Sequence, residues 1–426
     1  MSATVVERVS ASSEKRDSIK GRHQVNHLSI MAKRQTSIYI IALVLLISLT
    51  LANVAGLILG SCIFFVPIGL RSFVLALILL FLTAYIYSNS EKQHEIKDRL
   101  WLIIKIWMPF IIYLGISTEL SQVGMWKFAG FCMRVFFPCL VLVVLYVNDK
   151  GLFNRYFART LLVINIILAV LVPFVPTQEE LIDMSIWISR GIAVSVFFLI
   201  IDLKLNRRGY LDLLLIVFLI VIMLFIGSRG PFVALLATLM LYFGLRSSRK
   251  LIVWPVMLYG CFLFVVAYLY VAPVNEAVES FLTHGHRGQY RIDNFADDRL
   301  AMIKPTVAIV KEHPLIGCGL GSWGIGYLNT IISEKAYVKL NVKKLWTRDY
   351  YYYPHNIISE ILCELGVIGM LLFIALFFPY KQLLDSHNIY NYFIIMGFLF
   401  ALTSSDLVIN STPFVFNTLS LLAYKE

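Results

Sequence analysis

The sequence contains few charged residues for its length. Only 15% of its 426 residues are Asp, Glu, Lys or Arg, whereas 59% are hydrophobic and the mean hydropathy is +0.78. A water-soluble protein of this composition would have too little polar surface to stay dissolved. Apolar runs of 17 or more residues recur along the chain, and each is long enough to cross the hydrocarbon core of a membrane as a helix. The composition therefore predicts a polytopic membrane protein.

Motifs for binding nucleotides, metals and nucleic acids are also absent. No P-loop is present, so nucleotide-activated donors are not expected. The six cysteines include no Cys-x-x-Cys pair and most lie in or near apolar segments, which is typical of packing residues. The pair Asp297-Asp298 is adjacent rather than spaced, so no metal or other cofactor is predicted. The net charge of +11 accompanies no basic helix or aromatic platform, so no nucleic-acid partner is expected.

The apolar runs predict an all-α fold, a polytopic transmembrane bundle of about twelve spans. Residues 1–36 are polar, carry seven Lys or Arg and lack the short apolar core of a cleavable signal, so we expect a disordered cytoplasmic tail. Residues 37–272 then hold spans one to nine, and residues 357–426 hold spans ten to twelve, although the last two could also form one segment. The spans are expected at 37–59, 72–88, 101–117, 129–147, 158–175, 185–203, 211–227, 230–246, 251–272, 357–380, 389–404 and 407–423.

The distribution of cations predicts the orientation of the bundle. Lys and Arg favour the cytoplasmic side of a membrane, and here they gather in the loops that share a side with the N-terminus. Both termini are therefore predicted to be cytoplasmic. The cations of the inner loops are Lys92, Lys97, Arg99, Lys150, Arg155, Lys204, Arg207, Arg208, Arg246, Arg249, Lys250 and Lys381. Nearly all those of the short outer loops are Arg71, Lys127 and Arg229.

One long polar segment, residues 273–356, interrupts the apolar pattern. Its place after span nine puts it on the side opposite the N-terminus, as a large periplasmic loop. A loop of this length usually folds over the membrane and carries function. Short helices are predicted from Arg299 and over 307–311, and His313-Pro314 should end the second one. The glycines of the turn predicted to follow are Gly317, Gly319 and Gly321.

The predicted topology brings several polar residues to the outer face. Ionisable residues near membrane depth usually face a cavity, a partner or a substrate. Arg can hold a pyrophosphate in two-point contact, and a His imidazole can remove a proton from a hydroxyl near neutral pH. Taken singly, Arg229 could reach lipid headgroups and Asp406 could cap the last span. Together the set suits recognition of a phosphorylated lipid, and its members are Arg190, Arg229, Arg299, His355, Asn356 and Asp406.

Three segments around the long loop contain recognisable sequence motifs. They are Gly227-Ser-Arg-Gly-Pro-Phe-Val-Ala-Leu-Leu, then Arg299-Leu-Ala-Met with His313-Pro-Leu-Ile-Gly-Cys-Gly-Leu-Gly, then Pro354-His355-Asn356 with Glu364-Leu-Gly-Val-Ile-Gly. Each is weak alone, but at this spacing they resemble the O-antigen ligase and O-antigen polymerase superfamily of bacterial polysaccharide assembly. The resemblance covers about residues 225–375.

The resemblance implies an inverting, metal-independent glycosyltransferase of GT-C-like fold in the bacterial inner membrane, with its active site on the periplasmic face. Such enzymes take a glycan from undecaprenyl pyrophosphate. In the ligases the acceptor is a sugar hydroxyl of lipid A–core, in lipopolysaccharide biosynthesis. In the polymerases it is another lipid-linked repeat unit. Membrane lipids are the surroundings that this reaction implies.

The family's residue roles transfer by position. Arg229 and Arg299 would hold the pyrophosphate as it leaves, and His355 would activate the acceptor hydroxyl or position the phosphates. These three are the predicted catalytic residues. Arg190 matches less clearly, because only Ser189-Arg190-Gly191 can be compared. The Ser405-Asp406 turn is similar to that of the ligases and favours a ligase over a polymerase. The predicted substrate-binding residues are Arg190, Asn356 and Asp406.

Two other classes of protein were considered. A transporter of lipid-linked sugars would have a similar number of spans, but transporters usually carry charged residues deep in their helices and have related halves. In this sequence the charges gather at one face, and the long loop has no counterpart in the other half. A structural scaffold would not need the set of Arg and His residues.

Overall fold

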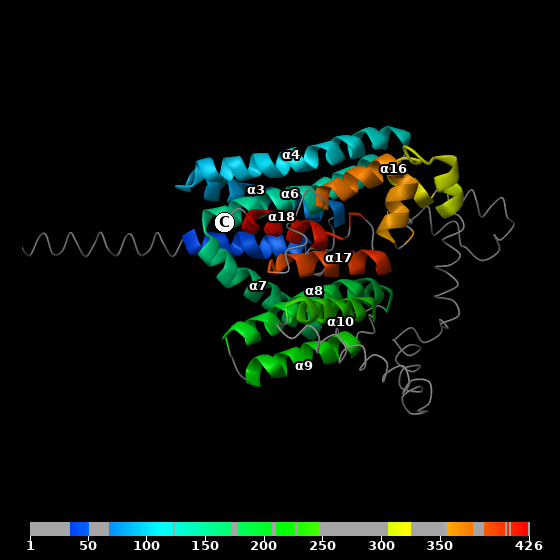
Figure 1. Cartoon of the computed structure of the whole chain (residues 1–426). Helices are drawn as coiled ribbons and strands as arrows, with labels where there is room; N and C mark the ends of the chain where they lie inside the picture. Colours follow the sequence, from blue (N-terminus) through cyan, green and yellow to red (C-terminus); the bar gives the residue numbers. More distant parts are fainter. Residues whose placement is uncertain are drawn as a thin grey trace, which may run out of the picture.

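The computed structural model describes residues 35–50, 68–121, 124–171, 178–206, 210–225, 229–246, 306–324, 354, 356–377, 387–404, 407–408 and 410–424. In these ranges the regular secondary structure is helical and contains no strand. Most of the helices run along a common direction in one bundle (Figure 1). The prediction of an all-α fold is confirmed.

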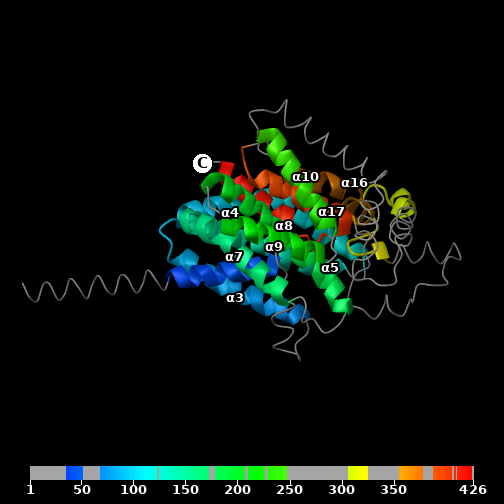
Figure 2. The ribbon, with the colours of Figure 1, turned by 90° about the horizontal axis from the view of Figure 1, so that it is seen from below.

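The first half of the bundle contains the helix Gln35–Thr50, α3 (Ile68–Ser88), α4 (Gln93–Ser117), the 3-10 turn η1 (Thr118–Leu120), α5 (Gly124–Phe131), the π-helical η2 (Cys132–Phe136), α6 (Phe137–Asn148), α7 (Lys150–Leu171), α8 (Gln178–Asn206), α9 (Tyr210–Phe225) and α10 (Arg229–Arg246). The second half contains α16 (Ile357–Phe377), α17 (Tyr390–Ser404) and α18 (Thr412–Tyr424). The helices α3 and α10 lie on opposite sides of the bundle in both views (Figures 1 and 2).

Each predicted span except one overlaps a described helix. The exception, 251–272, lies outside the described residues, as do residues 1–34 of the predicted tail. Within the described ranges, four helices are long and apolar enough to cross a membrane, namely Gln93–Leu120, Gly124–Asn148, Lys150–Leu171 and Ile357–Phe377. In the other apolar helices, the stretches in which side chains are described are 10–17 residues long. The fold is therefore that of a membrane protein, whereas the count of twelve spans and the predicted orientation stay predictions.

The C-terminal helix α18 lies at the centre of the bundle. Residues 410–422 are all buried, as expected of a helix that is enclosed by others on every side. The ring of Phe414 packs 5.5 Å from Trp107 of α4 and 5.7 Å from Phe131 of α5, between ring centroids. On another side it packs 6.0 Å from Phe373 of α16. This aromatic core fixes α4, α5 and α16 relative to one another.

The long polar loop is described over residues 306–324, which lie at one end of the bundle next to the start of α16, whereas α18 ends at the opposite end (Figures 1 and 2). A helix covers 306–312 and stops at His313-Pro314, as predicted. Three glycines then form the predicted turn with left-handed backbone, at φ of 73° for Gly317, 99° for Gly319 and 81° for Gly321. Both sequence predictions for this segment are confirmed.

The helix α16 is broken at Gly366, where φ is 64° and ψ is −166°, and Figure 1 shows its two parts meeting at an angle. In an unbroken helix, the N–H groups of Val367 and Ile368 would donate to carbonyls four residues earlier. Instead, the Val367 N–H donates to the Pro314 carbonyl at 2.9 Å, and the Ile368 N–H donates to the Leu315 carbonyl at 3.1 Å. The loop thus supplies both of the acceptors that the break removes.

The same loop also satisfies the two carbonyls that the break leaves open. The Cys318 N–H donates to the Cys363 carbonyl at 2.8 Å, and the Gly319 N–H donates to the Glu364 carbonyl at 3.0 Å. Four hydrogen bonds to the loop therefore replace two within the helix. Backbone groups away from water must find such partners, so the break in α16 and the docked loop depend on each other.

Glycine is required on both sides of this contact. A Cβ atom on Gly317 would lie 2.3 Å from the carbonyl carbon of Glu364, and one on Gly366 would lie 2.4 Å from the carbonyl carbon of Leu315. Both distances are far inside van der Waals contact with backbone atoms that cannot turn away. The close approach of the two backbones therefore explains why the segment that begins at His313 and the segment that begins at Glu364 both contain glycine.

We expect Gly366→Ala to destabilise the protein. The left-handed conformation disfavours a side chain by about 1–2 kcal/mol, and the clash with Leu315 adds to this. The matched control is Gly115→Ala in α4, where the new Cβ would meet Phe128 at an ordinary 3.7 Å. Thermal unfolding in detergent micelles should show a lower Tm for the first variant and an unchanged or higher Tm for the second. Equal Tm values for both would contradict the docking of the loop.

Candidate active site

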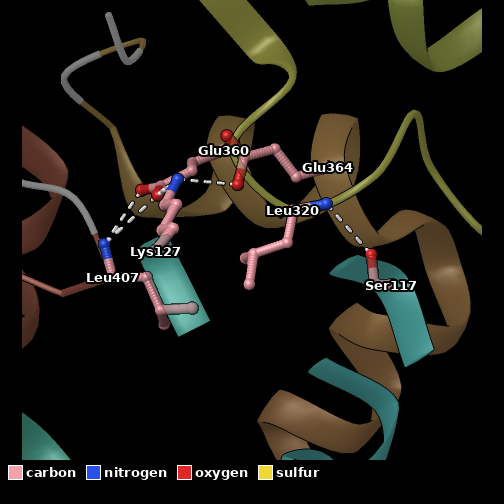
Figure 3. A network of polar contacts seen from close by, with 6 residues as sticks. All are labelled: Ser117, Lys127, Leu320, Glu360, Glu364 and Leu407. Carbon is pink, nitrogen blue, oxygen red and sulfur yellow. Dashed lines mark hydrogen bonds and ion pairs between the residues drawn. The ribbon is translucent and has the colours of Figure 1, made fainter. Parts of the chain in front are cut away.

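A buried ion network lies where the loop meets α16. The Lys127 side chain is fully buried, and its Nζ lies 2.5 Å from Glu360 Oε1 and 2.6 Å from Glu364 Oε2 (Figure 3). The two carboxylates are four residues apart, so they project from neighbouring turns of α16. The prediction that Lys127 is a cation of a short outer loop is wrong, because this residue lies inside α5.

The network joins segments that are far apart in the sequence. The Leu407 N–H, just after α17, donates to both oxygens of Glu360 at 3.0 and 3.3 Å. Beside it, the Leu320 N–H of the docked loop donates to the Ser117 Oγ of α4 at 3.1 Å (Figure 3). The loop, α4, α5, α16 and the turn after α17 are thus held together at one end of the bundle.

The stability of this network depends on whether its buried charges are paired. Glu360 and Glu364 are each 1% exposed, and a carboxylate removed from water is strongly unfavourable unless it is paired. The Lys127 ammonium group contacts both of them. Among the described residues, Oε1 of Glu364 has no hydrogen-bond partner. Loss of Lys127 would therefore remove this cation from two carboxylates that are both buried.

We expect Lys127→Met, which keeps the length of the side chain, to destabilise the protein by about 3–5 kcal/mol, the usual effect of breaking a buried pair. Adding Glu360→Gln and Glu364→Gln should restore much of this loss, because the buried negative charges disappear with the positive one. The exposed Lys97, changed to Met, is the control. Unfolding of the purified variants in micelles measures the effect, and wild-type stability of Lys127→Met would contradict it.

The predicted substrate-binding residue Arg190 is buried in α8, with 4% of its surface exposed. Its guanidinium carbon lies 5.3 Å from the ring centre of Trp187 and 5.8 Å from that of Phe400 in α17. Cation–π contacts of this kind orient an Arg and leave its planar face packed. Phe400 lies one turn before the end of α17, so Arg190 lies beside the last turns of that helix.

Asn356 caps the start of α16. Its Oδ1 accepts hydrogen bonds from the N–H groups of Ile358 at 2.9 Å and Ser359 at 3.2 Å, the usual contacts of an N-cap residue. Its amide nitrogen lies 3.5 Å from the Leu402 carbonyl of α17, to which it donates. Asn356 and Arg190 thus each contact the last turns of α17. Whether Asn356 also binds substrate stays a prediction.

The other predicted site residues are described only in part. Arg229 is the first residue of α10, a helix that packs against both α8 and α17. In the sequence, His355 directly precedes the cap Asn356, and Asp406 directly precedes Leu407, which is bound to Glu360. The residues of the predicted set that lie outside the described part are Arg299, His355 and Asp406, and the pair Asp297-Asp298 lies outside it as well.

No group of three or more His, Cys, Asp or Glu side chains that could hold a metal ion occurs among the described residues. Metal independence stays a prediction. The cysteines that are described, Cys132, Cys139, Cys318 and Cys363, form no disulfide and are buried or partly buried, which agrees with their expected role in packing. Burial, with the nearby Glu364, raises the pKa of the Cys318 thiol to about 12, so this thiol is neutral at physiological pH and supplies no thiolate.

Three residues of the ion network were missed from the sequence. Lys127 was assigned to a loop, and the side chains of Glu360 and Glu364 were given no role, although Glu364 begins one of the family segments. A signal was present, because two acidic residues four apart in an apolar helix need a cationic partner. The identity of that partner could not be read from the sequence, since Lys127 and Glu364 are separated by 237 positions.

Part of the chain matches a known protein family. Residues 214–374 match the family described as O-antigen ligase. The matched range includes α10, the docked loop and most of α16. A search of curated proteins found no match to the chain. Residues 214–374 are thus identified as an O-antigen ligase family domain, which confirms the resemblance predicted from the three segments.

Proposed function

We propose that the protein is an O-antigen ligase of the bacterial inner membrane. It transfers a glycan from undecaprenyl pyrophosphate to a sugar hydroxyl of lipid A–core on the periplasmic face. The observation that carries this proposal is the convergence of Arg190 and the capped start of α16 on the last turns of α17. Most of α16 and all of α10 belong to the range that matches the ligase family.

The residue types proposed for the site suit this transfer. The acceptor oxygen forms a bond to the anomeric carbon of the glycan from the face opposite the pyrophosphate. The bond between that carbon and the phosphate oxygen breaks, and its electron pair leaves with the pyrophosphate. Arg229 and Arg299 stabilise the negative charge that grows on this leaving group. The proton of the acceptor hydroxyl passes to His355.

The surrounding structure supports the positioning of these groups. Asn356 fixes the first turn of α16 through its cap, and the contacts of Lys127 with Glu360 and Glu364 hold the next two turns. Catalytic groups act best when the elements that carry them are held in this way. We therefore assign the ion network a supporting role, outside the contact with substrate.

The substrate-binding assignments are finer parts of the same proposal. Arg190 is oriented by two aromatic rings and adds a permanent positive charge next to the last turns of α17. We propose that it contacts the phosphates or the first sugar of the donor. Asp406, next in sequence to Leu407, would accept hydrogen bonds from sugar hydroxyls. A polymerase would use the same site for the donor but a second lipid-linked repeat unit as acceptor.

We expect Arg229→Ala to lower the rate of glycan transfer by about 10²–10³, the usual effect of losing one donor that stabilises a transition state. Arg299→Ala and His355→Ala should lower it comparably. The matched control is Arg246→Ala, at the other end of the same helix α10, where the guanidinium contacts Tyr242. The assay uses purified protein in proteoliposomes with a lipid-pyrophosphate glycan and lipid A–core, and each variant is first shown to unfold at the wild-type temperature.

The same assay separates the alternatives. Attachment of the glycan to lipid A–core supports the ligase, whereas extension of the glycan without that acceptor would show a polymerase. No transfer of either kind by the wild-type protein would indicate a transporter or a scaffold. Transfer by His355→Ala at the wild-type rate would remove this residue from the mechanism. Full activity of Arg229→Lys would show that charge alone, and not two-point contact, is needed.

A further inference from the structure

The tip of the docked loop exposes two aliphatic side chains. Leu315 is 64% exposed and Ile316 is 49% exposed. They follow the exposed residues Lys311, Glu312, His313 and Pro314 in the chain. Adjacent exposed aliphatic side chains in a polar loop point to a surface that is covered by something apolar.

The tip lies against the last turns of α4 and the part of α16 that follows the break. The Leu315 carbonyl accepts a hydrogen bond from Ile368, the second residue after Gly366. The Ile316 carbonyl accepts a hydrogen bond from the Tyr113 hydroxyl of α4 at 3.3 Å, one turn before α4 ends. Both α4 and α16 are long and apolar enough to cross a membrane.

The helices α4 and α16 expose aliphatic side chains near the tip. Ile112 and Ile116 of α4 are 53% and 62% exposed, and Val367 and Leu371 of α16 are 42% and 61% exposed. Exposed aliphatic side chains on helices that cross a membrane face lipid. Leu315 and Ile316 lie next to these two helices, because their carbonyls are within hydrogen-bond distance of Ile368 and Tyr113.

The backbone of the tip is paired only in part within the protein. The carbonyls of Pro314 and Leu315 accept hydrogen bonds from Val367 and Ile368, and the Tyr113 hydroxyl lies 3.3 Å from the Ile316 carbonyl and 2.8 Å from the Leu365 carbonyl. Among the described residues, the N–H groups of Leu315 and Ile316 have no backbone partner, so this backbone suits the membrane interface, where headgroups and water can pair with it, and not the hydrocarbon core. The Gly317 N–H donates to the His313 carbonyl at 3.1 Å.

We propose that residues 313–317 lie at the membrane interface, where the side chains of Leu315 and Ile316 contact the acyl chains of the membrane leaflet at this end of the bundle. The outer loop is then anchored in the bilayer beside the break in α16. This turn belongs to the same segment whose glycines dock on α16. Its contact with lipid does not depend on which glycan or acceptor the protein uses.

The test places a fluorescent NBD group at Leu315→Cys in a variant without the native cysteines, reconstituted in phosphatidylcholine vesicles. The control is Glu312→Cys, three residues earlier on the exposed helix 306–312. At position 315 we expect blue-shifted emission, several-fold stronger quenching by doxyl-labelled lipids and weaker quenching by iodide than at 312. Equal quenching at both positions, with full access of iodide, would overturn the proposal.

A second measurement keeps the native cysteines, in case their removal prevents folding. A benzophenone amino acid at position 315 of the otherwise wild-type chain should form adducts with phosphatidylcholine on irradiation, detected by mass spectrometry, whereas the same group at 312 should not. Adducts at neither position, in folded protein, would overturn the proposal. Adducts at 315 that form only with added undecaprenyl pyrophosphate, and on its tail, would also overturn it and would assign the surface to the substrate instead.

Discussion

The exchange of four backbone hydrogen bonds between the glycine turn and the break in α16 is the contact on which this end of the molecule depends. A break inside an apolar helix exposes two N–H groups and two carbonyls, and no water is present in hydrocarbon to satisfy them. The loop can reach all four only because Gly317 and Gly366 allow the two backbones to touch. The ion network around Lys127 then fixes the half of α16 that precedes the break.

This arrangement determines where chemistry can take place. The half of α16 before the break begins at the Asn356 cap, next to the last turns of α17 and the Arg190 side chain. The loop that docks on the break and the helix that receives it are both inside the range that matches the O-antigen ligase family. A long outer loop is thereby attached at a defined place, close to the residues that are proposed to act on the donor.

The sequence predicted the helices well, because runs of apolar residues report directly on burial in lipid or protein. It also predicted the turn at Gly317 from the glycines themselves. The break at Gly366 was not predicted, since Glu364-Leu-Gly-Val-Ile-Gly has the composition of a continuous helix and only the docked loop explains its conformation. The assignment of Lys127 to a loop failed for a related reason: ion pairs between helices depend on packing, which composition does not report.

The central claim is that the donor binds at the end of the bundle where α16 begins. The most direct measurement is a cryo-electron microscopy map of the full-length protein in a lipid nanodisc with an undecaprenyl-pyrophosphate glycan. The account predicts density for the pyrophosphate beside the first residues of α10 and α16 and the last turns of α17. Density for the pyrophosphate at the opposite end, near Arg246 and the start of α7, would contradict it.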